Sequence, residues 1–110
     1  MTPEAKVKDK IKKILKEHGV YYAMPMGTGY GNAGVPDFLC CVHGKFLAIE
    51  AKAGSGKTTA LQDKNLSAIH DCGGQAWVIN ENNLHELVET IKFLKGEWMM
   101  GIMKEKLEAV

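Results

Sequence analysis

Two acidic residues and one lysine of this 110-residue chain are spaced so that they could share one catalytic site. Residues 37–42 and 45–51 are rich in strand-forming apolar side chains, and a His-Gly pair between them predicts a hairpin with a two-residue turn. In the register of that hairpin Asp37 lies opposite Glu50, and Lys52 follows two positions later on the same face. The pattern therefore predicts two carboxylates and one ammonium group at the open end of the hairpin.

Two facing carboxylates need a stabilising partner, because like charges directly opposite each other destabilise a strand pair. A divalent cation such as Mg²⁺, which prefers oxygen ligands, would supply that partner. A lysine beside it could orient the attacking water or offset negative charge that builds up on phosphorus. The alternative is a surface ion pair between Glu50 and Lys52, worth ~0–1 kcal/mol, with Asp37 as a strand-entry residue after Pro36.

These residues and their neighbours resemble the PD-(D/E)xK nuclease superfamily, and more closely its virus-type replication–repair (VRR-NUC) nuclease domain. That family combines a glutamate in a first helix, a G-x-P-D strand start, an E-x-K strand end and a glutamine in the following helix. The corresponding residues here are Glu4, Gly34-Val35-Pro36-Asp37, Glu50-Ala51-Lys52 and Gln62. The resemblance covers nearly the whole chain and implies a restriction-endonuclease-like α/β fold.

The resemblance also implies an activity: a Mg²⁺- or Mn²⁺-dependent endonuclease that hydrolyses phosphodiester bonds of DNA. The implied catalytic residues are Asp37, Glu50, Lys52 and Gln62. The implied metal ligands are Asp37, Glu50, the backbone carbonyl of Ala51 and Glu4. Compact stand-alone members, typical of phages, are similar to Holliday-junction resolvases and act as homodimers. The resemblance therefore implies branched DNA, such as a four-way junction, as the substrate.

Glu4 and Gln62 also have plain structural interpretations. Glu4 lies in the first turn of a predicted helix, where a carboxylate stabilises the helix dipole by ~0.3–1 kcal/mol. Its spacing to Val7 and Ile11 nevertheless places it on the sheet-facing side of that helix. Gln62 follows Thr59 by three residues and so completes a Thr-x-x-Gln capping box. Helix capping and a catalytic role are compatible for Gln62.

Positive charge is concentrated in the first half of the chain. Residues 1–57 contain nine lysines and five acids, whereas residues 58–110 contain five lysines and eight acids, and the chain has no arginine. A basic half suits a polyanion such as DNA, although six of these lysines lie on one predicted helix and could form a solvated face. The candidate DNA contacts are Lys8, Lys12, Lys57 and, by stacking on a base, Tyr30.

Two competing functions remain open at this stage. Gly54 to Thr58 lies between a predicted strand and a predicted helix, as a phosphate-binding P-loop does, but Ala51 occupies the position of that motif's first glycine. A nucleotide hydrolase would require Lys57 and tolerate a change at Lys52, whereas a nuclease would show the reverse. The second alternative is a non-catalytic DNA-binding module with a nuclease-like fold, which binding without cleavage would favour.

The composition is that of an ordinary globular domain, with 45% hydrophobic and 25% charged residues. No apolar run approaches the roughly 18 residues needed to cross a bilayer, so we expect no membrane segment. The three cysteines, odd in number with two adjacent, indicate reduced thiols and an intracellular protein. The resemblance to phage-type nucleases implies the cytoplasm of a bacterial or phage-infected cell. A zinc site from cysteines and histidines is disfavoured, because no Cys-x-x-Cys spacing exists.

Capping and periodicity predict the elements that must position the site. The expected order is α-β-β-β-α-β-α, a mixed central sheet flanked by helices. The expected ranges are 3–18, 20–25, 37–42, 45–51, 59–72, 75–79 and 83–94. We assign the nuclease-type domain to residues 1–94. The apolar tail, residues 95–110, is expected to pack across a two-fold dimer interface.

Overall fold

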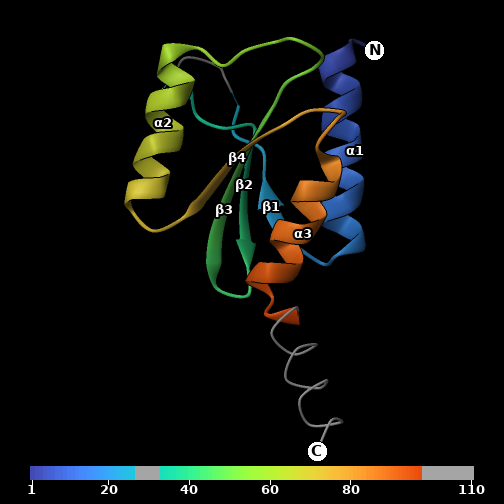
Figure 1. The fold of residues 1–110 in the computed structure, drawn as a ribbon, viewed down its shortest axis with the longest axis vertical. Coiled ribbons are helices and arrows are strands. Elements are labelled where there is room, and N and C mark those ends of the chain that lie inside the picture. Colours follow the sequence, from blue (N-terminus) through green and yellow to red (C-terminus); the bar gives the residue numbers. More distant parts are fainter. Residues whose placement is uncertain (27–32, 98–110) are drawn as a thin grey trace, which may run out of the picture.

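A computed structural model describes residues 1–26 and 33–97, and its elements follow the expected order (Figure 1). They are α1 (Pro3–Glu17), β1 (Tyr21–Ala23), β2 (Phe38–Val42), β3 (Lys45–Ala51), α2 (Ala60–Asp71), β4 (Gln75–Ile79) and α3 (Leu84–Leu94). The first strand is shorter than expected and ends at Ala23, because Pro25 cannot donate a hydrogen bond to a ladder. No helix in these two described ranges is long and apolar enough to cross a membrane.

The four strands form one mixed sheet in the order β1-β2-β3-β4. β2 pairs antiparallel with both β1 and β3, whereas β3 and β4 are parallel and are connected through α2. His43 and Gly44 have positive φ values of 48° and 79°, as both central residues of a type I′ turn require. The register pairs Leu39 with Ala48, which confirms the predicted hairpin.

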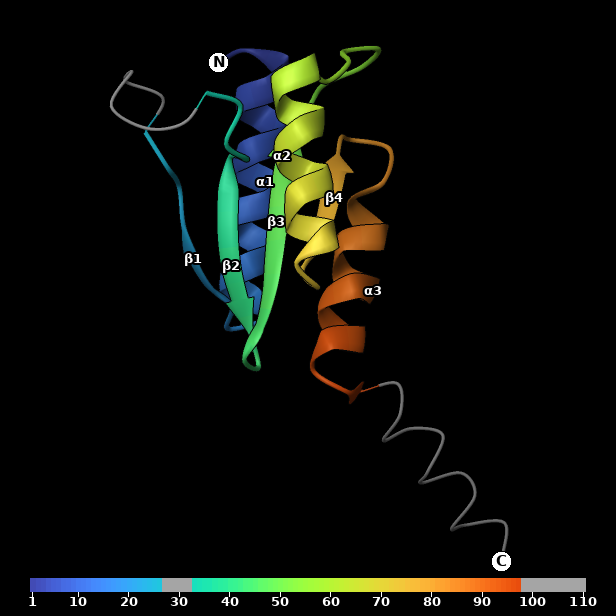
Figure 2. The ribbon, with the colours of Figure 1, turned by 90° about the vertical axis from the view of Figure 1, so that its left-hand side faces the viewer.

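The helices cover the two faces of the sheet unequally. α1 and α3 lie on one face and α2 lies on the other (Figure 1). The buried core forms on the first face, where apolar side chains of both helices meet the sheet: Val7, Ile11, Leu15, Leu87, Ile91 and Leu94 against Phe38, Leu47, Ile49 and Ile79. α2 contains no buried residue, and Figure 2 shows that it lies over β3 and β4 while β1 and β2 stay open on that face.

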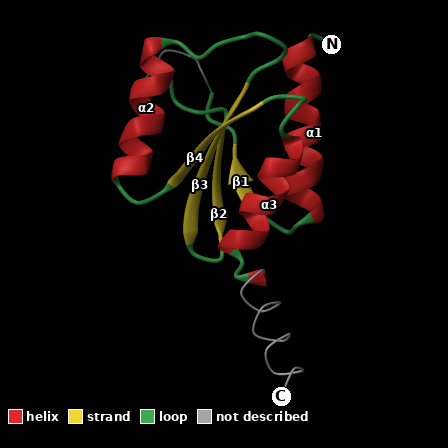
Figure 3. Cartoon of the chain, viewed as in Figure 1, coloured by secondary structure: helices red, strands yellow, loops and turns green. Residues whose placement is uncertain are grey.

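Four separate elements reach the same end of the molecule. The start of α1, the start of β2, the end of β3 and the start of α2 all lie at the upper end in Figures 1 and 3. Residues 52–59, which connect β3 to α2, run across this end. The fold therefore brings residues from distant parts of the sequence to one place, and the predicted site lies there.

Candidate active site

Asp37 and Glu50 lie one position beyond the last pair of the hairpin ladder, Phe38 with Ile49. Asp37 is fixed by the strand that it faces, because its Oδ2 accepts the backbone N–H of Ala51 at 2.8 Å. Glu50 is only 3% exposed, which is unusual for a carboxylate. The hairpin thus places one partly buried and one fully buried acid side by side.

The environment of Glu50 disfavours a bare negative charge. Burial, and next the nearby Asp37 carboxylate, raise the pKa of Glu50 to about 7, although Lys52 acts in the opposite direction. Its Oε2 is buried and has no hydrogen-bond partner among the described residues. A buried acceptor without a donor is costly, and a cation at this oxygen would compensate it. The donor set therefore fits a hard divalent cation.

Lys52 and Glu4 join this pair from two different elements. Lys52 Nζ lies 3.9 Å from Glu50 Oε1 and 4.0 Å from Glu4 Oε1. The Lys52 side chain is 14% exposed, whereas that of Glu4 is 43% exposed. The start of α1 thus brings Glu4 to the site, as its sheet-facing position predicted, but its carboxylate lies beside the lysine.

Gln62 serves two purposes through the two ends of its amide. Its Oε1 accepts the Thr59 N–H at 2.9 Å while Thr59 Oγ1 accepts the Gln62 N–H at 3.2 Å, so the predicted capping box is present. Its Nε2 donates to Glu50 Oε1 at 3.0 Å. The cap of α2 therefore orients the amide that holds Glu50.

The loop before Asp37 packs directly on the first turn of α2. Gly34 has a φ of +80°, and a Cβ added there would lie 2.6 Å from the backbone carbonyl carbon of Leu61. Asn65 strengthens the contact, because its Nδ2 donates to the Ala33 carbonyl at 3.1 Å. Only glycine allows this approach, so the glycine of the G-x-P-D motif determines where α2 lies relative to Asp37.

Lys8 is part of the site, which the sequence analysis did not predict. It was a candidate DNA contact, but its Nζ lies 3.4 Å from Asp37 Oδ1 and 3.9 Å from Glu4 Oε2. The available signal was its position one helical turn after Glu4, on the same side of α1. The contact from the Ala51 N–H to Asp37 was also missed, because a backbone amide carries no sequence signature.

The other predicted DNA contacts do not gather around the carboxylates. Lys57 is exposed in the connection between β3 and α2, at the site's end of the molecule. On α1, Lys12 Nζ lies 3.8 Å from Asp9 Oδ1. Tyr30 lies outside the described residues, and so do residues 98–110 of the predicted interface tail.

The geometry favours neither the P-loop nor the zinc interpretation. The Gly54 N–H donates to Glu81 Oε1 at 2.7 Å, so a carboxylate of the chain itself occupies an amide that a P-loop would direct at phosphate. Cys40 is buried whereas the neighbouring Cys41 is exposed, because they lie on opposite faces of β2. Within residues 1–26 and 33–97 no group of three or more His, Cys, Asp or Glu residues could hold a metal ion, so the Asp37–Glu50 pair would need further oxygen ligands.

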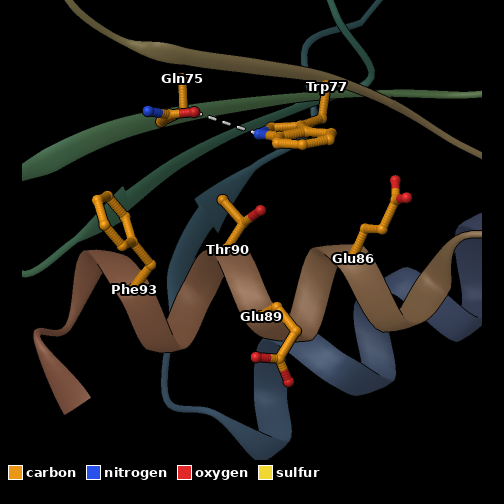
Figure 4. A pocket seen from close by; sticks show the side chains of 6 residues that line it. All are labelled: Gln75, Trp77, Glu86, Glu89, Thr90 and Phe93. Carbon is orange, nitrogen blue, oxygen red and sulfur yellow. Dashed lines mark hydrogen bonds between the residues drawn. The ribbon is translucent and has the colours of Figure 1, made fainter. Parts of the chain in front are cut away.

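A separate hollow of about 430 Å³ lies between β4 and α3 (Figure 4). It is lined by Gln75, Trp77, Glu86, Glu89, Thr90 and Phe93. Trp77 is paired with Ile49 in the sheet, so its side chain faces α3 and lies on the face opposite Glu50. Two glutamates at this hollow make it unsuited to a phosphate backbone, and it is not part of the carboxylate site.

The comparisons with known proteins identify the fold. No protein-family model matches the sequence, and the comparison with curated proteins gives no match. Among solved structures, a VRR-NUC domain is similar with a TM-score of 0.61, covering 86% of this chain and 95% of that domain at 17% identity. Archaeoglobus fulgidus Hjc, a Holliday junction resolvase from an archaeal hyperthermophile, is similar with a TM-score of 0.49, covering 67% of this chain and 65% of that one at 19% identity. The chain has the VRR-NUC-like nuclease fold, as the motifs predicted.

Proposed function

We propose that this chain is a metal-dependent DNA endonuclease. The observation that carries the proposal is the cluster of Asp37, Glu50 and Lys52, in which Glu50 Oε2 is buried and receives no hydrogen bond from residues 1–26 and 33–97. The nuclease fold of the similar VRR-NUC domain supports the same class of activity. Such a cluster is expensive to maintain without a ligand, so a role in binding explains it better than a role in stability.

Asp37 and Glu50 would hold Mg²⁺ or Mn²⁺, with the Ala51 carbonyl as a further candidate ligand. Glu4, whose carboxylate lies beside Lys52, would have to move to join them. When bound, the cation activates water and offsets the charge of a phosphate. The two carboxylates are already oriented before binding, Asp37 by the Ala51 N–H and Glu50 by Gln62. Preorientation of this kind lowers the cost of assembling a metal site.

Lys52 would supply a positive charge at the site, held in place by its two carboxylate neighbours. Glu4 Oε1 and Glu50 Oε1 lie 4.0 and 3.9 Å from its ammonium group, and these two ion pairs restrict the movement of a flexible side chain. From there it would orient a water molecule for attack on the phosphodiester, or stabilise the charge that develops on phosphorus. Gln62 acts through Glu50 and is a positioning residue.

The substrate that we propose is branched DNA, on the basis of the motif resemblance. Lys57, Lys8 and Lys12 would contact the phosphate backbone as point charges. The proposal also includes a homodimer, because two sites related by a two-fold axis could cut two strands symmetrically.

The test is cleavage of a labelled four-way junction and a matched linear duplex in Mg²⁺, Mn²⁺ or EDTA. Wild type should cut only with metal, and Lys52→Ala should lower the rate by about 100-fold or more, the usual cost of losing one charge-stabilising group. Lys64→Ala removes an exposed lysine of α2 as the matched control and should cut at the wild-type rate. A higher rate on the junction than on the duplex would support the branched-DNA proposal.

Other outcomes would support the alternatives. Metal-independent DNA binding without cleavage by folded wild type would favour the non-catalytic module. ATP hydrolysis that Lys57→Ala abolishes and Lys52→Ala does not affect would favour the P-loop. Equal cleavage by wild type and Lys52→Ala would contradict the proposed mechanism.

A further inference from the structure

The two oxygens of Asp37 have different partners. Oδ2 accepts the backbone N–H of Ala51 at 2.8 Å and is therefore fixed by the fold. Oδ1 lies 3.4 Å from Lys8 Nζ, an ammonium group on a flexible stem that comes from a different element. Oδ1 is thus the oxygen of Asp37 that can exchange its partner without disturbing the sheet.

The carboxylates around this oxygen outnumber the ammonium groups by one. Three carboxylates, those of Glu4, Asp37 and Glu50, lie among two ammonium groups, those of Lys8 and Lys52. The side chains of Lys8 and Asp37 are 30% and 21% exposed, so water weakens their attraction only in part. Lys8 therefore compensates a charge that would otherwise face the buried Glu50.

We propose that Lys8 is a built-in counter-ion that competes with the divalent cation for Asp37 Oδ1, an inference that rests on the proposed function. Two positive charges cannot share one carboxylate oxygen favourably, so cation binding requires Lys8 to withdraw. The pair keeps the acids close together while the cation is absent, and it lowers the affinity of the site for the cation. Lys8, once withdrawn, becomes available to the phosphate backbone at the site's edge.

A structural role for Lys8 predicts a different result. Lys8 also lies 3.9 Å from Glu4 in an i, i+4 arrangement on α1, and such pairs merely stabilise a helix by a few tenths of a kcal/mol. Loss of a helix-stabilising pair would leave the affinity for the cation unchanged or lower it. Loss of a competing counter-ion raises that affinity, so the sign of the change separates the two roles.

The experiment measures Mn²⁺ binding to the DNA-free protein by isothermal titration and electron paramagnetic resonance. Lys8→Met keeps the apolar stem and should bind Mn²⁺ about three- to tenfold more tightly than wild type, the range expected for removing a partly screened pair. Lys8→Arg keeps the charge and should restore the wild-type affinity. Lys10→Met, at an exposed position two residues along the same helix, removes the same charge and should change the affinity by less than about twofold.

A second readout tests the withdrawn state. In Ca²⁺, used as a probe that need not support cleavage, Lys8→Met should bind the four-way junction more weakly than Lys10→Met does. Unchanged or weaker Mn²⁺ binding by folded Lys8→Met, repeated with Lys8→Gln, would overturn the inference and leave the nuclease proposal standing. A wild type that binds no Mn²⁺ at all would overturn the nuclease proposal, and this inference with it.

Discussion

Glu50 is the residue on which the site depends, and its two carboxylate oxygens differ in the same way as those of Asp37. Gln62 donates to Oε1, and Oε2 has no hydrogen-bond partner within the described ranges. A glutamine at this position would preserve the accepted hydrogen bond and remove the charge. The cost of the buried charge can therefore be measured separately from the fold.

The buried charge predicts that stability falls as pH rises when no metal is present. The pKa of Glu50 is raised from an ordinary value of 4.5 to about 7, so between these values the native state binds more protons than the unfolded state. Below pH 4.5 Glu50 is protonated in both states and does not lower the free energy of unfolding. Between pH 4.5 and 7 that free energy declines, and above pH 7 the buried charge lowers it by about 3 kcal/mol. Urea unfolding in EDTA at pH 5 to 8 should show that Glu50→Gln lacks this decline and exceeds wild type at pH 8.

Mg²⁺ provides the complementary control for Glu50. It should raise the unfolding midpoint of wild type at pH 8 and have a much smaller effect on Glu50→Gln, because a ligand stabilises only the state that it binds. Parallel pH profiles for the two proteins in EDTA would show that Glu50 is not the group responsible.

Sequence reasoning predicted the residue pairs that follow from strand periodicity. The His-Gly turn set the hairpin register, so the proximity of Asp37 to Glu50 followed from counting. Lys8 could not be placed in the same way. Its position one turn after Glu4 puts it on the same side of α1, but the distance from that side to Asp37 depends on how α1 packs against the core. The distances from Lys52 to Glu4 and Glu50 could not be predicted from the sequence for the same reason.

At the scale of elements, the site is the junction between a strand entrance and a helix start. The sequence predicted both ends, from Pro36 before the strand and from Thr59 as the helix cap. It did not predict that Gly34 meets the backbone of α2 at Leu61. That contact connects the loop carrying Asp37 to the helix that carries Gln62.

Gly34→Ala should therefore damage the site more than a positive φ alone explains. Ala at a φ of +80° costs roughly 1 kcal/mol, and its Cβ would also lie 2.6 Å from backbone atoms that cannot move separately. We expect a loss of about 2–4 kcal/mol in the free energy of unfolding and a large loss of cleavage. Chemical denaturation and junction cleavage measure the two effects.

Gly44→Ala is a matched control for this prediction. Gly44 has nearly the same φ, +79°, but a Cβ added there meets nothing within 4 Å, and the turn lies at the far end of the hairpin from Asp37. Its substitution should cost roughly 1 kcal/mol and leave cleavage near wild type in conditions where the protein is folded. Equal losses in both variants would show that close packing at Gly34 is unimportant.

At the scale of the whole molecule, the order of elements and the mixed sheet matched the sequence prediction, because helix and strand periods differ and Thr2 and Thr59 mark the starts of α1 and α2. The sequence did not predict that helices cover the two faces of the sheet unequally. On the face that carries α2, Tyr21 of the uncovered β1 is 77% exposed, and it is in register with the exposed Cys41 of β2. The molecule thus has an open apolar sheet face besides the apolar tail beyond residue 95.

The proposed homodimer can use only one of these two surfaces as its main contact, and we predict that it uses the tail. Trp98, Met99, Met100, Ile102, Met103 and Leu107 give the tail large side chains of the kind enriched at interface cores. Light scattering at micromolar concentration should give twice the 12.1 kDa chain mass for wild type. Ile102→Lys places a charge in the tail and should yield the monomer, whereas Tyr21→Lys places the same charge on the open face and should leave the dimer intact. The reverse result would assign the interface to the sheet face, and a monomeric wild type would remove the dimer from the proposal, so that cutting both strands of a junction would require two independent binding events.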